Sequence, residues 1–192
     1  MAAQQEQKGR ANALKSELKV HIEETSAAPA EVVYQLLSDL RSHLEWAGER
    51  QPKDNYRLLS IEAPEGPASV GTEFSSTGAD PMGRFADSSV VTEASRPTLF
   101  EFVTEANQTM KKGAVVVWTS VHRYEIEPRE HGSRIAYTIR TVRISRLPGA
   151  LVAFNVPGLR SLLMRFAGSN ARRGVRNLAR MAEEGARQGS AA

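Results

Sequence analysis

A histidine in the middle of a strongly alternating segment is the residue of this chain best placed to do chemistry. Along residues 114–127, His122 shares one face of a predicted strand with Ser120 and Tyr124, whereas Arg123 and Glu125 fall on the other face. A neutral imidazole there could orient a ligand carbonyl, or act as a general acid or base near its unperturbed pKa. The alternative is a buried histidine that Ser120 or a backbone carbonyl holds, with no further role.

The face that carries His122 is apolar at its ends and polar in its middle. Its members are Ala114, Val116, Trp118, Ser120, His122, Tyr124 and Ile126. A sheet that closes over a solid core has no use for serine and histidine in such a column, whereas the wall of a ligand cavity does. The pattern therefore predicts an internal cavity for a small molecule.

Aromatic and cationic side chains elsewhere extend this prediction. Tyr137, like Trp118 and Tyr124, could stack on a flat ligand while its polar tip finds a partner. Arg84 follows a segment rich in glycine and proline that could gate the cavity mouth, and its guanidinium could pair with an anionic or enolate oxygen. The catalytic candidates are His122, Tyr124 and Arg84. The predicted ligand-binding residues are Trp46, Phe74, Arg84, Phe100, Phe102, Trp118, Ser120, His122, Tyr124, Tyr137 and Phe166.

Metal and nucleotide sites are not predicted. The four histidines fall on different predicted elements, and the chain has no cysteine, so no metal-ligand spacing exists. A P-loop, a Rossmann glycine pattern and a nucleophile elbow are also missing from the sequence. We therefore expect no metal and no cofactor. The lack of cysteine and the polar character of residues 1–16 favour a cytoplasmic location over export.

The elements that must position these residues can be predicted from periodicity. Alternation from Glu17 predicts a first strand, Pro29 opens an apolar-striped helix, and a short helical turn follows near Trp46. Strands are predicted at 56–63, 69–77, 84–94 and 98–105, before a long hairpin of 114–127 and 133–145. An amphipathic helix of up to about 27 residues, roughly 40 Å long, follows Gly158.

This order of elements resembles the helix-grip fold of the START-like superfamily, also called Bet v 1-like or SRPBCC. Residues 27–39 resemble its entry into the first helix, Trp46 stands where many members have a tryptophan, and residues 70–72 resemble the turn into a middle strand. Residues 124–128 and 132–137 resemble the late hairpin of the polyketide cyclase/dehydrase-like branch. The resemblance implies an α+β fold, in which a curved antiparallel sheet of about seven strands wraps around a long C-terminal helix, with two short helices after the first strand.

The resemblance also implies a function. We expect a single domain over residues 17–186, between a flexible leader at 1–16 and a flexible tail at 187–192. Members of the superfamily enclose an apolar cavity that takes lipids, sterols, polyketides, quinones or plant hormones. Our first prediction is therefore a carrier or sensor of a hydrophobic small molecule. The alternatives are a polyketide cyclase/aromatase-like enzyme acting on an aromatic precursor, and a cochaperone-like protein-interaction module.

The net charge of +3 hides an asymmetry along the chain. Residues 1–139 carry 15 Lys and Arg against 20 Asp and Glu, whereas residues 140–192 carry 10 arginines against two glutamates. The basic end is either a solvated helix face or a site for an anionic partner. Weak peripheral membrane contact through Leu147–Arg173 is an alternative to the packing of the apolar segment as a cap over the cavity. No nucleic-acid partner is predicted, because interleaved aromatics are lacking, and the chain is expected to be a monomer or a homodimer.

Overall fold

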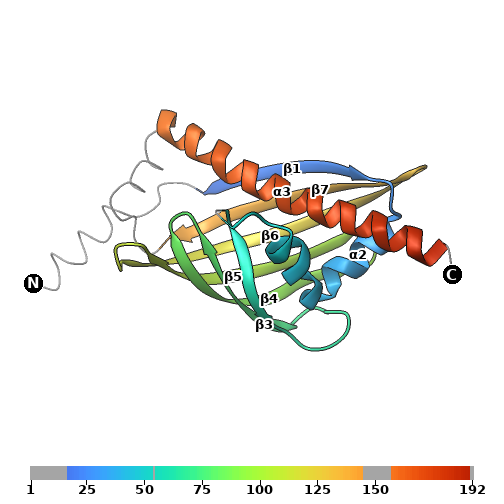
Figure 1. Ribbon diagram of the computed structural model, residues 1–192, viewed down its shortest axis with the longest axis horizontal. Coiled ribbons are helices and arrows are strands. Elements are labelled where there is room, and N and C mark those ends of the chain that lie inside the picture. Colours follow the sequence, from blue (N-terminus) through green and yellow to red (C-terminus); the bar gives the residue numbers. More distant parts are fainter. Residues whose placement is uncertain (1–16, 54, 145–156, 191–192) are drawn as a thin grey trace, which may run out of the picture.

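A curved antiparallel sheet and one long helix dominate the computed structural model, which describes residues 17–53, 55–144 and 157–190 (Figure 1). The seven strands follow the order β1-β7-β6-β5-β4-β3-β2. The elements are β1 (Leu18–Ser26), α2 (Ala30–Ser38), the short helix η1 (Leu40–Ser42), the π-helical turn η2 (Glu45–Glu49), β2 (Arg57–Glu62), β3 (Glu73–Asp80), β4 (Gly83–Ser95), β5 (Leu99–Met110), β6 (Val115–Arg129), β7 (Gly132–Ile144) and α3 (Pro157–Ser190). The predicted helix-grip α+β fold is confirmed.

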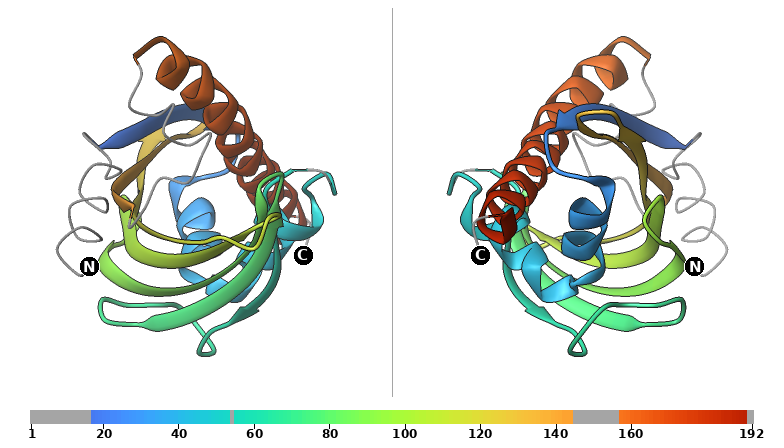
Figure 2. Two further views of the ribbon diagram at one scale, coloured as in Figure 1. Left: turned by 90° about the vertical axis from the view of Figure 1, so that its left-hand side faces the viewer. Right: turned by 90° about the vertical axis from the view of Figure 1, so that its right-hand side faces the viewer.

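Helix α3 lies across the open side of the curved sheet, from the β1 edge to η2 (Figure 2). Its apolar stripe packs inward, where Val175, Leu178 and Ala182 are almost completely buried. The helix spans 34 residues and continues to Ser190, so it is longer than predicted and includes part of the expected tail. The leader and the apolar segment 147–156 lie outside the described residues. Within the described ranges, no helix is long and apolar enough to cross a bilayer.

Polar contacts fix α3 against η2. The side-chain amide of Asn177 donates to the carbonyl oxygens of Trp46 and Arg50, at 3.1 and 3.2 Å. Both acceptors lie in or next to the last turn of η2, where carbonyl groups lack regular helical partners. The guanidinium of Arg50 pairs with Glu45 and, at 2.8 Å, with Glu184 on α3. These contacts hold Trp46 in place beneath the helix.

The connection between β3 and β4 is tighter than the sequence predicts. Instead of ending before a gating loop, β3 continues to Asp80, and Pro81 and Met82 alone form the turn. Asp80 stabilises this turn by accepting a hydrogen bond from the Met82 backbone N–H at 2.7 Å. Gly78 lies inside the strand because a Cβ at this position would come within 2.0 Å of the Phe85 ring. The glycine therefore marks close packing, and the predicted loop is mostly strand.

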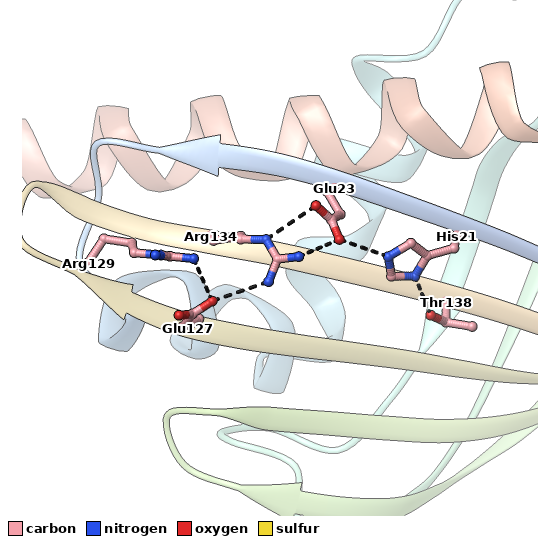
Figure 3. A network of polar contacts seen from close by, with 6 residues as sticks. All are labelled: His21, Glu23, Glu127, Arg129, Arg134 and Thr138. Carbon is pink, nitrogen blue, oxygen red and sulfur yellow. Dashed lines mark hydrogen bonds and ion pairs between the residues drawn. The ribbon is translucent and has the colours of Figure 1, made fainter.

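Charged side chains on the outer face of the sheet form one network across β1, β6 and β7. Figure 3 shows its members, which are His21, Glu23, Glu127, Arg129, Arg134 and Thr138. Arg134 contacts Glu23 and, at 3.2 Å, Glu127, while His21 lies between Glu23 and the Thr138 hydroxyl. The alternate residues of β1 and β7 point toward α3 and are mostly apolar. The network thus marks the solvent side of the sheet.

Candidate ligand-binding cavity

A cavity of about 430 Å³ lies between the concave face of the sheet and α3. This volume falls within the range of small-molecule sites, roughly 300–1,000 Å³. Side chains of all seven strands, of η2 and of α3 line it. Helix α3 contributes mainly small residues, among them Ala167, Ala171 and Gly174. Small side chains on the helix leave the space that a packed core would otherwise fill.

Aromatic rings form one wall of this cavity. His122 stacks on Phe102 with their ring centroids 4.7 Å apart and their planes 5° from parallel. Tyr124 stacks on Tyr137 at 4.5 Å, and Trp46 meets the Tyr124 ring edge-on at 6.4 Å. Offset and edge-to-face contacts of this kind stabilise aromatic clusters and leave ring faces for a flat ligand.

The polar tips within the aromatic wall bond to one another. His122 Nδ1 lies 2.8 Å from the Tyr137 hydroxyl oxygen, and Tyr137 also hydrogen-bonds Tyr124. Burial lowers the pKa of His122 to about 4, and nearby His43 acts in the same direction. Burial also raises the pKa of both tyrosines. At neutral pH the three groups are uncharged, so they can offer hydrogen bonds to a ligand but no ionic contact.

The partner of His122 differs from the ones that the sequence suggests. The Ser120 hydroxyl lies 3.1 Å from the Thr141 hydroxyl, on the neighbouring strand. Tyr137 takes the place expected of Ser120 because its long side chain reaches diagonally from β7 to β6.

A second histidine, His43, reaches the same cavity and was not predicted. It follows η1, is 3% exposed, and donates from Nε2 to the Leu37 carbonyl oxygen at 2.9 Å. Its ring packs against Trp46 at 4.7 Å. Burial lowers its pKa to about 4, more than the Leu37 carbonyl and Asp39 raise it. The spacing of His43 and Trp46, three residues apart in a helical segment, is the sequence signal that could have placed them on one face.

A further set of polar side chains lies on β3, β4 and β5. Asp87 Oδ1 accepts hydrogen bonds from the Ser76 backbone N–H at 3.1 Å and from the Ser76 hydroxyl at 2.8 Å. The Ser89 and Thr104 hydroxyls lie 2.8 Å apart. Burial raises the pKa of Asp87, although the two hydrogen bonds from Ser76 act against this shift. All four residues line the cavity.

The pattern that predicts a cavity wall on β6 recurs on β4. Phe85, Asp87, Ser89 and Val91 share the inward face of β4, which is also apolar at its ends and polar in its middle. The outward face of β4 also mixes polar and apolar residues, so this signal alone does not identify which face of β4 lines the cavity.

The structure brings together most of the predicted ligand-binding residues. Those that line the cavity are Trp46, Phe74, Phe102, His122, Tyr124 and Tyr137. They come from η2 and from strands β3, β5, β6 and β7, so residues far apart in sequence meet on one wall.

Arg84, Phe100, Trp118 and Ser120 do not join this lining. Arg84 is exposed and precedes the inward-facing Phe85 on β4, so its side chain lies on the outer face. Phe100 is fully buried in the core, and Trp118 and Ser120 lie on the inward face of β6 beyond the cavity. The backbone of Phe166 belongs to α3, but its side chain lies outside the described part of the structure. In the part of the chain described, no three acidic or histidine side chains gather as a metal site.

Comparisons with known proteins agree with this geometry. A family model described as polyketide cyclase / dehydrase and lipid transport matches residues 17–183. A solved protein from Rhizobium leguminosarum is similar with a TM-score of 0.61 and 16% identity, over 90% of this chain and 97% of that chain. A protein from Thermus thermophilus is similar with a TM-score of 0.59 and 16% identity, over 86% of this chain and 97% of that chain. The di-domain ARO/CYC StfQ from the steffimycin biosynthetic pathway is similar with a TM-score of 0.60 and 18% identity, over 95% of this chain and 55% of that chain. At these identities the structures share the fold alone. No curated protein matches the chain.

Proposed function

The chain belongs to the polyketide cyclase/dehydrase and lipid transport family, and from this premise we propose that it binds a hydrophobic small molecule, as a carrier or sensor. The observation that carries the proposal is the cavity of about 430 Å³ between the sheet and α3. Protein interiors are normally packed to the density of organic crystals, so a space of this size is not a packing defect. Its aromatic and aliphatic walls, with a few hydrogen-bonding groups, are typical of a small-molecule site.

Two features favour binding over catalysis of the cyclase type. The pKa of His122 is about 4, far below neutral pH, whereas an efficient general acid or base has a pKa near the working pH. Arg84, the residue expected to stabilise an oxyanion, is exposed on the outer face of β4. A catalytic role for His122 would require that His122→Ala lower turnover of an aromatic precursor far more than affinity for it.

The cochaperone-like alternative would need an exposed apolar patch as its docking site. The apolar surface that supports our proposal is instead internal, because the rings of Trp46, Phe102 and Tyr124 are each more than nine-tenths buried. An internal surface suits a small guest better than a protein partner.

Native mass spectrometry of freshly purified protein, followed by organic extraction, tests the proposal. We expect a mass excess that corresponds to one bound small molecule, and recovery of that molecule in the extract. Protein that purifies empty would be titrated with Nile red, a neutral apolar dye, with saturable binding of one dye per chain as the expected result. Protein that carries no molecule and shows no saturable dye binding would overturn the proposal.

A further inference from the structure

The formal charges around the cavity have one sign. Asp80 and Asp87 line it, and none of the described lining residues is a lysine or an arginine. The two lining histidines, His43 and His122, are neutral at pH 7 because burial lowers their pKa. Among the described lining residues, the wall therefore offers acidic and neutral polar groups, and no cation that could receive an acid.

The carboxylates of Asp80 and Asp87 differ in how many hydrogen bonds they accept from the protein. Asp80 accepts hydrogen bonds from two backbone N–H groups of its own turn and from Gln108 at 3.2 Å, so its charge serves the β3–β4 hairpin. Asp87 lies in the middle of β4 and accepts from Ser76 alone, with both bonds on Oδ1. Its Oδ2 atom has no hydrogen-bond partner among the residues described. Asp87 thus receives fewer hydrogen bonds from the described protein residues than Asp80. A hydrogen-bond donor of the ligand could bind Oδ2 and stabilise its charge.

The surroundings of Asp87 suit a molecule with a polar head and a flat body. Ser89 lies two residues further along the same face of β4, and its hydroxyl pairs with that of Thr104 on β5. The next inward residue of β5 is Phe102, which carries the stacked ring of His122. A ligand head at Asp87 and Ser89 would therefore place an attached ring system along the Phe102 and His122 wall.

We propose that the ligand is a flat apolar molecule that presents a hydrogen-bond donor, an amine or a hydroxyl, to Asp87, and that the cavity rejects carboxylates. This inference rests on the proposed function, since it specifies the ligand class of the same cavity. Rejection follows from the juxtaposition of like charges in a desolvated site with no cation among the described lining residues.

Three naphthalene probes that differ only in their head group test the inference. They are 2-naphthylmethylamine, 2-naphthalenemethanol and 2-naphthoic acid, measured at neutral pH by displacement of Nile red. We expect the amine and the alcohol to bind, and the acid to bind at least about tenfold more weakly than the alcohol. Asp87→Asn keeps an oxygen for Ser76 but removes the charge, so it should bring the affinities for acid and amine closer by about tenfold while changing that for the alcohol less than about threefold.

The controls separate failure of this inference from failure of the proposed function. Asp39→Asn makes the same change at an exposed aspartate outside the cavity and should leave all three affinities unchanged. Absence of any binding by protein that purifies empty, Nile red included, would overturn the proposed function. If Nile red binds, three results would overturn only the inference. The acid could bind as tightly as the alcohol, or no probe could displace the dye. The third result is that Asp87→Asn leaves the ratio of the acid and amine affinities unchanged. Even if Asp87→Asn does not fold, the ratio of acid to alcohol affinity in the unmodified protein tests the rejection of carboxylates.

Discussion

His122 and Tyr137 share a hydrogen bond across two strands, with Nδ1 of the imidazole 2.8 Å from the phenol oxygen. Tyr137 stands directly opposite Tyr124 in the register of β6 and β7, so the bond to His122 is a diagonal one. The two tyrosines also bond each other, which links three polar tips inside an apolar wall. His122 Nδ1 and the two tyrosine hydroxyls therefore satisfy one another inside the apolar wall, and burial keeps each group neutral.

Removal of the Tyr137 hydroxyl should destabilise the protein. Tyr137→Phe leaves a buried imidazole nitrogen without its partner, which typically costs about 1–3 kcal/mol in the free energy of unfolding. Urea denaturation measures the loss. Tyr34→Phe is the matched control, because Tyr34 is also buried but its hydroxyl has no hydrogen-bond partner among the described residues. Equal losses in the two variants would show that the bond to His122 contributes nothing to stability.

Stability should fall as the pH drops from about 6.5 toward 4, and His43 should be one cause. Burial lowers its pKa from 6.5 to about 4. In this window the unfolded chain binds a proton at His43 that the folded chain does not, so acidification favours unfolding, by on the order of 3 kcal/mol over the whole window. His122 acts in the same direction because its pKa is lowered similarly.

Urea denaturation from neutral pH to about pH 4.5 checks this pH dependence. His43→Gln retains an amide donor for the Leu37 carbonyl but cannot titrate, so it should reduce the slope of stability against pH by about half. His131→Gln is the control, because it makes the same substitution at a histidine whose side chain is 91% exposed. An unchanged slope in His43→Gln would rule out a neutral buried imidazole at this position.

The fold could be predicted because its signals are local. Alternation marks each strand, and a single amphipathic stripe marks α3, whatever lies elsewhere in the chain. The predicted end of β3, at residue 77 instead of Asp80, was wrong for a physical reason. Gly78 is typical of a turn in sequence, but its role is to make room for the ring of Phe85, which is a contact between strands.

The cavity residues could be predicted only where one face of a strand is clearly the inner one. On β6, His122 lies on a face that is apolar at both ends, and the opposite face carries the charged residues Arg123, Glu125 and Glu127. On β4 both faces mix polar and apolar residues, so sequence alone does not tell whether Arg84 or Asp87 points inward, and the wrong choice reverses every side chain. His43 is buried by contacts with Trp46 and Phe102, which periodicity within a strand cannot reveal.

Substitutions at two neighbouring residues of β7 should show that a buried hydrogen bond contributes more to the free energy of unfolding than surface ion pairs do. Ser133 is 2% exposed and donates to the Ala28 carbonyl oxygen at 2.8 Å, so Ser133→Ala should lower the free energy of unfolding by about 1–2 kcal/mol. Arg134 belongs to the outer network of Figure 3, where ion pairs are hydrated and screened. Arg134→Ala should cost less than Ser133→Ala, and its effect should shrink at high salt. A larger, salt-independent loss in Arg134→Ala would contradict this ranking, as urea titrations at low and high sodium chloride would reveal.

A side chain added at Gly174 should fill the cavity without harming the fold. Gly174 lines the cavity from α3, and an added Cβ would lie 3.5 Å from the Gln51 amide nitrogen and 3.9 Å from the Trp46 ring, both ordinary contacts. Gly174→Leu also replaces a poor helix former, with a gain in helix propensity of up to about 1 kcal/mol. We expect the melting temperature to stay the same or rise, while Nile red binding weakens at least about tenfold because the leucine occupies the ligand's space.

Gly185→Leu is the control for this substitution. Gly185 is exposed on the same helix, and the nearest atom to its added Cβ is 4.0 Å away, on Val32. This variant should show a similar gain in helix propensity and retain the dye affinity of the unmodified protein. Gly174→Leu with unaltered dye binding would place the ligand outside the space between sheet and helix. Because the two variants carry the same substitution on one helix, a difference in dye binding between folded forms reports on the cavity and not on helix stability.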